Sequence, residues 1–382
     1  GALGDVLRTT LLAQALKDKY KSKNPQIYWI TDKKAIPFFI NNPYVTKVLE
    51  EEKSFILKDT SFDIIINLEE DRKSCAFTSL LKSKRIIGAY LDKEGKIDYT
   101  KESEYWFDTS RISKLGEEKA DKLKIINKKT HRQILCEMIG VQWKKYEPFF
   151  RLTANQRKLR EDFLRRHNLS MGDLIIGING GAADRWPKAL PINKTVKLIN
   201  SLYKKYKATI LLFGGPNEIE RNKEIHKLTK TPIIDTGCGN DLIEFPALIS
   251  ACNFFVTTDS LGMHIALALK RKTIVFVGPT SPHELDMYGL GEKIVAKSKY
   301  VSTYRLAPKN IMDKINLEEA FKAIAVLLHQ KIVLVITAFK EPNIRKAIES
   351  AIAQKTKYDY QILISAPDKE TLDIAEEYAR KD

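Results

Sequence analysis

The opening of the chain combines glycines, a carboxylate and an arginine in a pattern that could carry out acid–base chemistry. The run Gly1-Ala2-Leu3-Gly4-Asp5 leads into a predicted helix that contains Arg8, Thr9 and Thr10. Glycines allow a tight bend before a helix, and a helix N-terminus favours negative charge. That dipole and Arg8 both favour the ionised form of Asp5, which a general base requires, although they also reduce its basicity. Helix N-capping is the commoner use of such an aspartate, and the spacing is not the G-x-G-x-x-G fingerprint of dinucleotide-binding enzymes.

A second glycine-rich turn follows an apolar segment that is typical of a strand. It reads Gly180-Gly181-Ala182-Ala183-Asp184-Arg185-Trp186-Pro187-Lys188. Its small residues let a ligand approach the backbone, and Arg185 and Lys188 are cations suited to a diphosphate. A plain turn with Trp186 packed beneath it would use the same residues, so this run alone is a weak signal.

A third turn, Phe213-Gly214-Gly215-Pro216-Asn217-Glu218-Ile219-Glu220, again joins a predicted strand to a helix. Glu218 or Glu220 could bind the hydroxyls of a ribose, because carboxylates accept hydrogen bonds. Acids in the first turn of a helix also interact favourably with its dipole, and this structural explanation fits equally well.

The densest group of polar residues lies in Thr257-Thr258-Asp259-Ser260-Leu261-Gly262-Met263-His264 and in the following Gly278-Pro279-Thr280-Ser281-Pro282. A strand would deliver Asp259 and Ser260 to its C-terminal end, where open α/β sheets bind ligands and where a helix begins. His264 could bond a phosphate, although a lone histidine is as often structural. Thr280 and Ser281, after the next strand, would face the same crevice.

Short apolar strands alternate with amphipathic helices before and between these turns. In residues 1–150 we expect strands at 27–31 and 63–67 and helices at 9–20, 75–81 and 132–140. Further along we expect strands at 174–179, 209–213, 232–235, 254–258 and 273–277, with helices at 191–205, 217–229, 243–251, 262–269 and 317–328. Such alternation predicts parallel, doubly wound sheets. We therefore predict an α/β protein with Rossmann-like domains at 1–150 and 151–330, joined near 145–155.

The tail, residues 331–382, has a different character. It carries nine basic and nine acidic side chains, so the excess of positive charge lies in residues 1–330. Strands at 332–336 and 360–365 and helices at 343–354 and 369–380 are too few to bury a sheet on both faces. We expect the start of a domain that is cut short. At the other end we expect a strand before Gly1, and none precedes it.

Composition limits the classes of function. The 382 residues are 43% hydrophobic and 29% charged, which excludes disorder, and their net charge of +16 favours an acidic partner. The four cysteines lie far apart, no metal-ligating pattern is present, and no run is apolar enough to cross a membrane, so we expect a cytoplasmic, metal-free protein. Binding to nucleic acid would depend on charge alone, because its usual motifs are missing.

Taken together and in order, the motifs resemble glycosyltransferase family 9, the heptosyltransferase-like enzymes of the GT-B fold. The resemblance runs over about residues 1–328. It is carried by Gly1 to Thr10, Asn42-Pro43-Tyr44-Val45, Arg185-Trp186-Pro187, Gly214-Gly215-Pro216, Asp259 to His264, and Gly278 to Pro282.

The resemblance implies an inverting transfer of a sugar from a nucleotide-diphosphate donor, typically ADP-heptose, to an acceptor of the lipopolysaccharide type. Asp5 matches the catalytic base of the family, and Gly4, Arg8 and Thr9 would lie beside it on the acceptor side. The residues expected to bind the donor are Gly180, Gly181, Arg185, Lys188, Glu218 or Glu220, Asp259, Ser260, Gly262, His264 and Thr280. No cofactor is implied, since the nucleotide sugar is a substrate.

The chain departs from the family pattern at two positions of the donor site. Asp184 stands where a lysine commonly precedes the Trp-Pro element, so Arg185 or Lys188 must neutralise the phosphate in its place. Leu261 replaces a residue that is often small. In the tail, Val335 to Ile344 resembles the opening strand and loop of family 2 glycosyltransferases, but Ser365-Ala366-Pro367-Asp368 replaces their usual paired aspartates.

We therefore predict a metal-independent GT-B transferase that builds a surface glycan or a lipid-linked glycan. The basic stretch from Lys119 to Arg132 could meet the anionic inner membrane or a phosphorylated acceptor, and it could equally be a solvated face. The alternative is a non-catalytic protein of the same fold that binds nucleotides or sugars. Transfer by the Asp5→Asn variant would distinguish the two.

Overall fold

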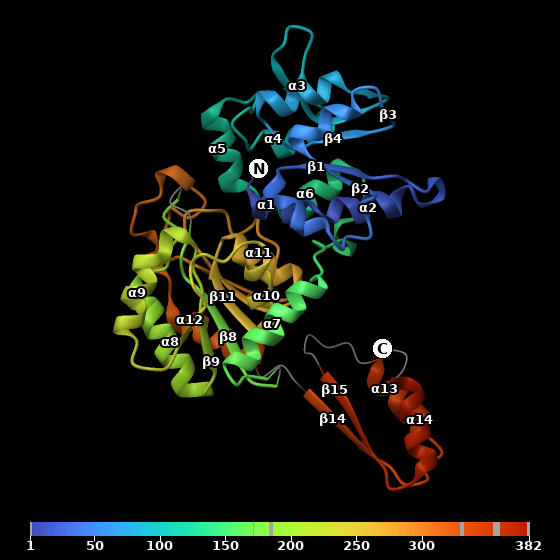
Figure 1. Cartoon of the computed structure of the whole chain (residues 1–382), viewed down its shortest axis with the longest axis vertical. Coiled ribbons are helices and arrows are strands. Elements are labelled where there is room, and N and C mark those ends of the chain that lie inside the picture. The colour runs from blue at the N-terminus through green and yellow to red at the C-terminus, as the bar shows by residue number, and fades with distance from the viewer. Residues whose placement is uncertain (1, 171, 183–185, 329–331, 354–359, 380–382) are drawn as a thin grey trace. The chain divides into compact units, whose positions relative to one another are not determined.

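The computed structural model describes residues 2–170, 172–182, 186–328, 332–353 and 360–379. It divides into two compact units, Gly1–Leu317 and Glu318–Asp382 (Figure 1). The first unit contains all the motifs that resemble family 9, and the segments that resemble family 2 lie in the second unit. Below, its N-terminal half is residues 2–153 and its C-terminal half is residues 154–317.

The C-terminal half is built on one six-stranded parallel sheet. Its strand order is β10-β9-β8-β11-β12-β13, in which the chain moves outward from β8 to one edge and then from β11 to the other. The strands are β8 (Ile175–Asn179), β9 (Thr209–Leu212), β10 (Ile234–Asp235), β11 (Phe254–Thr258), β12 (Lys272–Val277) and β13 (Gly291–Val295). This order is that of a doubly wound nucleotide-binding fold, as predicted.

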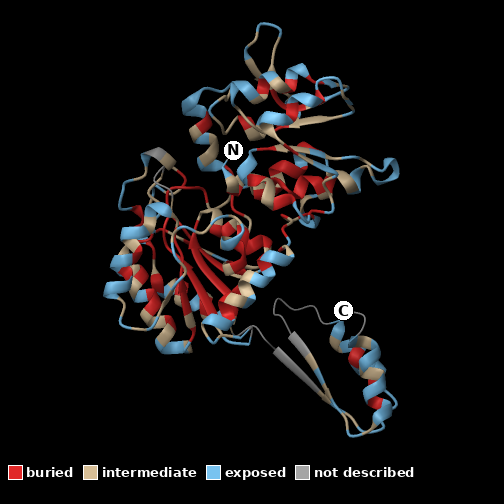
Figure 2. Ribbon diagram, viewed as in Figure 1, coloured by how far each residue is buried: buried red, intermediate tan, exposed pale blue. Residues whose placement is uncertain are grey.

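Helices cover both faces of this sheet. In Figure 1, α8 and α9 lie on one side of it, and α7, α10 and α11 lie on the other. The elements are α7 (Ala154–Arg166), α8 (Ile192–Tyr206), η6 (Pro216–Glu218), α9 (Ile219–Leu228), α10 (Glu244–Ala251), α11 (Leu261–Ala268), η7 (Tyr304–Leu306) and η8 (Ile311–Lys314). Every residue of β8 and β11 is buried (Figure 2), which explains why both read as continuous apolar runs.

The N-terminal half has smaller sheets. β1 pairs with β2, β3 with β5 and β4 with β6, all in parallel. The strands are β1 (Tyr28–Thr31), β2 (Lys47–Glu50), β3 (Ser61–Phe62), β4 (Ile65–Asn67), β5 (Lys82–Ser83), β6 (Ile86–Leu91) and β7 (Ile97–Tyr99). The expectation of purely parallel pairing is wrong at β7, which pairs antiparallel with β6 because a tight turn through Asp92 and Gly95 joins the two.

Helices of the N-terminal half pack around these strands. They are α1 (Leu3–Thr9), α2 (Leu11–Lys19), α3 (Arg72–Leu80), α4 (Glu104–Phe107), α5 (Glu117–Ile126) and α6 (His131–Met138), with 3-10 turns η1 (Lys21–Lys23), η2 (Lys33–Phe39), η3 (Glu51–Leu57), η4 (Lys101–Ser103) and η5 (Trp143–Lys145). The helix expected at 9–20 is α2, and a separate helix, α1, precedes it from Leu3, with Thr10 between the two. Asp5 therefore lies inside the first turn of α1.

One apolar cluster joins the two halves of the first unit. Leu7 of α1 and Phe38 of η2 pack in the same buried cluster as Phe255 of β11 and Ile265 of α11. The second unit holds most of α12 (Leu317–Leu328), the parallel pair β14 (Ile332–Thr337) and β15 (Tyr360–Ser365), and helices α13 (Ile344–Ile352) and α14 (Lys369–Ala379). None of the described helices is long and apolar enough to span a bilayer.

Candidate active site

The loops predicted to bind a donor leave the same edge of the C-terminal sheet. β8 and β11 are neighbours at its centre, where the direction of winding reverses, and parallel strands end on one side. Thr258 Oγ1 donates a hydrogen bond to the carbonyl of Gly181 at 2.7 Å, which ties the loop after β8 to the end of β11. The sheet thus brings together two motifs that are far apart in the sequence.

Asp259 and Lys188 form the charged centre of this edge. Lys188 Nζ lies 3.2 Å from Asp259 Oδ2, and both side chains are largely buried. Burial alone would raise the pKa of Asp259, but Lys188, His264 and the hydroxyl of Thr280 outweigh it and hold that pKa below its ordinary value. The buried hydroxyl of Ser281 has no hydrogen-bond partner among the described residues, so it can bond an incoming group.

Helix α11 begins beside this ion pair. Ser260 stands at its N-cap, but its hydroxyl lies 3.1 Å from Thr257 Oγ1 and makes no capping bond. The first turn of a helix has N–H groups without intrahelical partners, and these favour an anion. A Cβ on Gly262 would lie 2.9 Å from Asn179 Nδ2, so glycine is needed for this helix to approach β8.

The two acids of the third turn have different surroundings. Glu218 Oε2 accepts a hydrogen bond from the N–H of Gly215 at 2.5 Å, and a Cβ on Gly181 would lie 2.5 Å from Glu218 Cγ. Glu218 therefore borders Gly181 in the loop after β8, and Gly180 of the same loop lies against Thr195. Glu220 is exposed and pairs with Lys223, so the structure does not bring it to this edge.

On the N-terminal half, α1 presents Asp5. Its carboxylate is 48% exposed, and Oδ1 lies 3.0 Å from Arg8 Nη2. Arg8 is much less exposed, packs over the ring of Trp106 and lies 2.8 Å from His131 Nδ1 through its other terminal nitrogen. The hydroxyl of Thr9 donates to the carbonyl of Val6 within the same helix, so this side chain is satisfied locally.

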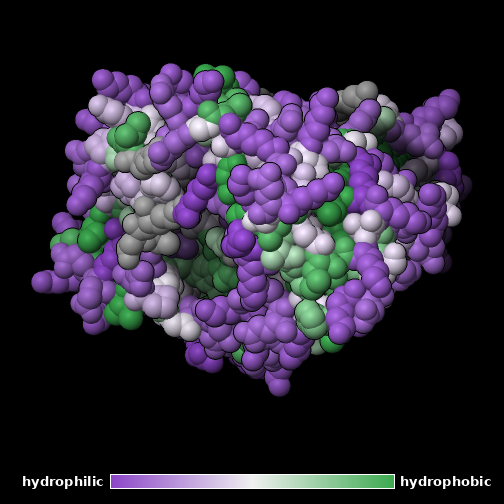
Figure 3. Space-filling view, turned by 90° about the horizontal axis from the view of Figure 1, so that it is seen from above, coloured by the Kyte–Doolittle hydropathy of each residue, from purple (hydrophilic) through white to green (hydrophobic). Residues whose placement is uncertain are grey.

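The two halves meet where Gly4 of α1 lies against His264 of α11. A Cβ on Gly4 would stand 2.7 Å from His264 Cδ2. Burial lowers the pKa of His264 to about 4 and Arg8 adds to this effect, whereas Asp259 and Asp5 oppose it. Asp5 of one half and Asp259 of the other thus both raise the pKa of this imidazole, although burial still leaves it neutral at neutral pH. The space-filling view shows a largely hydrophilic face that is hollowed at one place (Figure 3).

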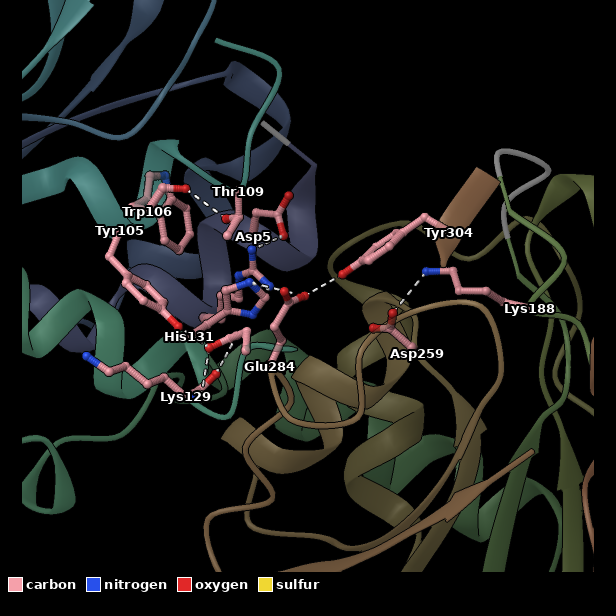
Figure 4. Close-up of polar contacts among 12 residues, drawn as sticks. Asp5, Tyr105, Trp106, Thr109, Lys129, His131, Lys188, Asp259, Glu284 and Tyr304 are labelled. Carbon is pink, nitrogen blue, oxygen red and sulfur yellow. Dashed lines mark hydrogen bonds and ion pairs between the residues drawn. The ribbon is translucent and has the colours of Figure 1, made fainter. Parts of the chain in front are cut away.

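Figure 4 shows Asp5 on one side of this junction, with Lys188 and Asp259 on the other. The predicted residues Arg185 and Gly1, and the departure at Asp184, lie outside the described part of the chain. In that part, no group of three or more His, Cys, Asp or Glu side chains is placed to hold a metal ion. The arrangement offers a partly exposed carboxylate opposite a cation, hydroxyls and a helix N-terminus, which suits transfer from a phosphate leaving group.

A comparison with protein families shows which family this chain belongs to. The family described as "Glycosyltransferase family 9 (heptosyltransferase)" matches residues 55–316. The chain belongs to glycosyltransferase family 9. A family 9 structure from Veillonella parvula, 19% identical, covers 86% of this chain and 95% of its own length with a TM-score of 0.69. The Escherichia coli ADP-heptose lipopolysaccharide heptosyltransferase II, 17% identical, covers 86% and 96% with a TM-score of 0.53. The family 9 chain thus has the predicted GT-B fold.

Curated relatives match a shorter region of the family 9 chain. Lipopolysaccharide heptosyltransferase 2 of Salmonella typhimurium is 33% identical over 111 residues, which are 28% of this chain and 30% of the relative. Lipooligosaccharide heptosyltransferase 2 of Campylobacter jejuni is 31% identical over 124 residues, 29% of this chain and 36% of the relative. The chain therefore spans about a third of the length of these relatives. The family match ends at residue 316, and the comparisons give no support to a family 2 domain in the tail.

Sequence reasoning missed three polar residues that lie beside this candidate site. Glu284 accepts a hydrogen bond from Tyr304 Oη at 2.5 Å, and its Oε2 lies 3.8 Å from His131 Nε2 (Figure 4). Glu284 comes two residues after the Gly278 to Pro282 motif, and that proximity was the available signal. His131 lies in the basic stretch from Lys119 to Arg132, which had been considered only as a surface.

That basic stretch is mostly paired within the chain. Lys122 pairs with Glu118, Lys129 pairs with Glu137, and the buried Arg132 lies 2.7 Å from Asp286 of the other half. Arg132 also packs between the rings of Trp143 and Tyr288. The expectation that Arg132 belongs to a solvated or membrane-facing surface is therefore wrong, because its charge is used between the halves.

Proposed function

We propose that the chain is an inverting, metal-independent glycosyltransferase that moves a heptose or a related sugar from a nucleotide-diphosphate donor to a lipopolysaccharide or other surface-glycan acceptor. The observation that carries the proposal is the junction at Gly4 and His264, where Asp5 of one half faces the Lys188–Asp259 edge of the other. ADP-heptose is the first donor to test, since that donor appears in the name of the solved Escherichia coli enzyme.

The two predicted Rossmann-like domains have separate roles in this proposal. Residues 1–150 hold the acceptor, and Asp5 removes the proton from its attacking hydroxyl. Residues 151–330 hold the donor, and the hydroxyl oxygen attacks the anomeric carbon from the face opposite the departing diphosphate. One base opposite one leaving group gives inversion, as the family resemblance implies.

The C-terminal half stabilises the charge that develops on the diphosphate. Lys188 supplies the cation that the aspartate at position 184 does not, and Asp259 holds this lysine in place at 3.2 Å. Ser260 at the start of α11, together with the buried hydroxyls of Thr280 and Ser281, adds hydrogen-bond donors for the diphosphate oxygens. Glu218, beside Gly181, is the better placed of the two acids for the ribose hydroxyls.

The first experiment separates donor binding from transfer. Thermal unfolding is measured with ADP, GDP, UDP and CMP, because a ligand at about 100 times its dissociation constant stabilises by ~2.7 kcal/mol. Transfer is then followed by release of nucleotide diphosphate from matching sugar donors in the presence of a deacylated lipopolysaccharide core.

The Asp5→Asn variant tests the base. Transfer should fall about 10²-fold or more while stabilisation by the nucleotide persists, since proton transfer typically contributes that much. Asp63→Asn is the matched control, because Asp63 is an exposed carboxylate of the same half that pairs with Lys84. Unchanged transfer by Asp5→Asn would refute the base assignment. Nucleotide binding without transfer by the wild type would favour the non-catalytic alternative.

Two finer proposals concern the surroundings of this reaction. The acceptor class implies work beside the inner membrane, and sedimentation with anionic vesicles tests peripheral binding. Residues 331–382 resemble the opening segment of a family 2 glycosyltransferase, and the strand–helix–strand–helix order of β14 to α14 suits that assignment. Deleting this segment should leave transfer unchanged.

A further inference from the structure

A chain of side-chain contacts leads from the donor loop of one half to Asp5 of the other. Trp186, next to Lys188 in the donor loop, packs edge-on against Tyr304 with ring centroids 5.8 Å apart. Tyr304 donates to Glu284, Glu284 faces His131, His131 contacts Arg8, and Arg8 pairs with Asp5. Of these residues, only Asp5 has a part in the chemistry proposed above.

In the hydrogen bond between Arg8 and His131, only Arg8 can be the donor. A guanidinium has only donors, so Nη1 of Arg8 donates and Nδ1 of His131 accepts. Burial, with help from Arg8 and His264, holds the pKa of His131 well below its ordinary value, which agrees with a neutral ring. The ring proton then lies on Nε2, which is the nitrogen that faces Glu284 at 3.8 Å.

This contact fixes the direction in which Arg8 approaches Asp5. His131 takes one N–H of Arg8 Nη1, and Arg8 Nη2 lies 3.0 Å from Oδ1 of Asp5. A guanidinium carries its five N–H donors in one rigid plane, so contacts on both sides set the orientation of that plane. The carboxylate of Asp5 is about half exposed, so an acceptor can still reach it.

The other end of this series of contacts, at Glu284 and Tyr304, is held by hydrogen bonds to the backbone. The carbonyl of Glu284 accepts the backbone N–H of His131 at 2.9 Å, and Lys293 Nζ bonds the carbonyls of Pro282 and Leu285 on either side. Tyr304 has a backbone φ of 49°, a left-handed conformation that is costly for a bulky residue. Its N–H bonds the carbonyl of Pro279 at 2.9 Å, which holds the hydroxyl toward Glu284.

We propose that His131 and Glu284 are positioning residues, which hold the guanidinium of Arg8 in place beside Asp5 and so keep this base oriented toward the acceptor hydroxyl. This inference rests on the proposed function, because it assigns the use of Asp5. Through Tyr304 and Trp186 the same contacts join the base to the donor loop, so a displaced donor loop also displaces the base.

Matched substitutions of His131 test the proposal. His131→Leu removes the acceptor, whereas His131→Asn keeps an oxygen near the position of Nδ1. We expect kcat to fall about 10–10²-fold in His131→Leu, as for a misplaced catalytic group, and to remain within about threefold of wild type in His131→Asn. Stabilisation by nucleotide should be equal in all three, since a defect in folding would lower it.

Substitutions of Glu284 provide a second pair. Glu284→Gln still accepts the hydroxyl of Tyr304 and should keep kcat close to wild type, whereas Glu284→Leu should lower it as His131→Leu does. An equal loss in the conservative and the apolar variant of either residue, or no loss in either apolar variant, would overturn the proposal.

Crystal structures of the two His131 variants provide a readout that does not depend on transfer. In His131→Leu, the guanidinium of Arg8 should move away from its position beside Asp5, and in His131→Asn it should stay there. An unchanged Arg8 in His131→Leu would overturn the positioning role even if kcat falls. If the wild type transfers no sugar with any donor, the proposed function fails, while the two structures still decide how Arg8 is held.

Discussion

His264 should make the folded protein sensitive to mild acid. Burial lowers its pKa from 6.5 to about 4 in the folded state. Between these values the unfolded chain binds a proton that the folded chain does not, so the free energy of unfolding falls as the pH drops. A pKa difference of about 2.5 corresponds to a loss of ~3 kcal/mol in total, of which about 2 kcal/mol occurs between pH 7.5 and 5.0.

The His264→Asn variant isolates this contribution. Other buried groups, His131 among them, have lowered pKa values and add to the acid sensitivity of the wild type. The contribution of His264 is therefore given by the difference between variants in the free energy of unfolding, rather than by the absolute value for the wild type. Urea unfolding at pH 7.5 and 5.0 should show that His264→Asn loses about 2 kcal/mol less than the wild type over this interval. Asp259 does not interfere, because its pKa is lowered from 3.8 and it stays ionised throughout.

His226→Asn is the control for this experiment. His226 is exposed on α9, so replacing it should reproduce the pH dependence of the wild type. Histidine ring NMR gives a direct second measurement, with the His264 signal assigned by its loss in His264→Asn. If that signal titrates near 6.5, or if His264→Asn loses as much stability as the wild type, burial at the junction of the halves is not the cause.

Three further substitutions follow from the same contacts. Gly4→Ala should lower both the melting temperature and transfer, because its Cβ would stand 2.7 Å from His264, and His264→Ala should relieve part of the defect in a double variant. Arg132→Ala should cost about 3–5 kcal/mol in urea unfolding, since it leaves Asp286 buried without its partner. Lys84→Ala, at an exposed ion pair, should change the unfolding midpoint by no measurable amount.

Strand-to-turn motifs were the part of this fold that could be predicted from the sequence. β8 and β11 are buried on both faces, so their apolar runs are continuous and end at the glycine or acid that starts the next turn. Helix α7 was missed, because only three of its side chains, Gln156, Phe163 and Leu164, are buried and its charged majority hides the apolar stripe. Strand β13 was missed because Gly291 and the charged Glu292 and Lys293 interrupt its pattern.

The residues of the candidate site also divide into those that the sequence could predict and those that it could not. Asp259, Ser260 and His264 follow one strand within six residues, so spacing alone brings them together. His131, Glu284 and Tyr304 belong to three distant segments that meet only through tertiary packing, and a single sequence does not contain that information. Glu220 was a natural candidate from its place in a helical turn, but the rotation of α9 directs it to solvent beside Lys223.

The pairing of Arg132 with Asp286 has a mechanical consequence. This buried ion pair, enclosed by the rings of Trp143 and Tyr288, resists separation far more than the water-exposed contacts around it. A motion of one half that preserved this pair would have to be a rotation about it. In such a rotation a side chain would travel in proportion to its distance from Arg132, so His131 would move little and the distant rims of the two halves would move most.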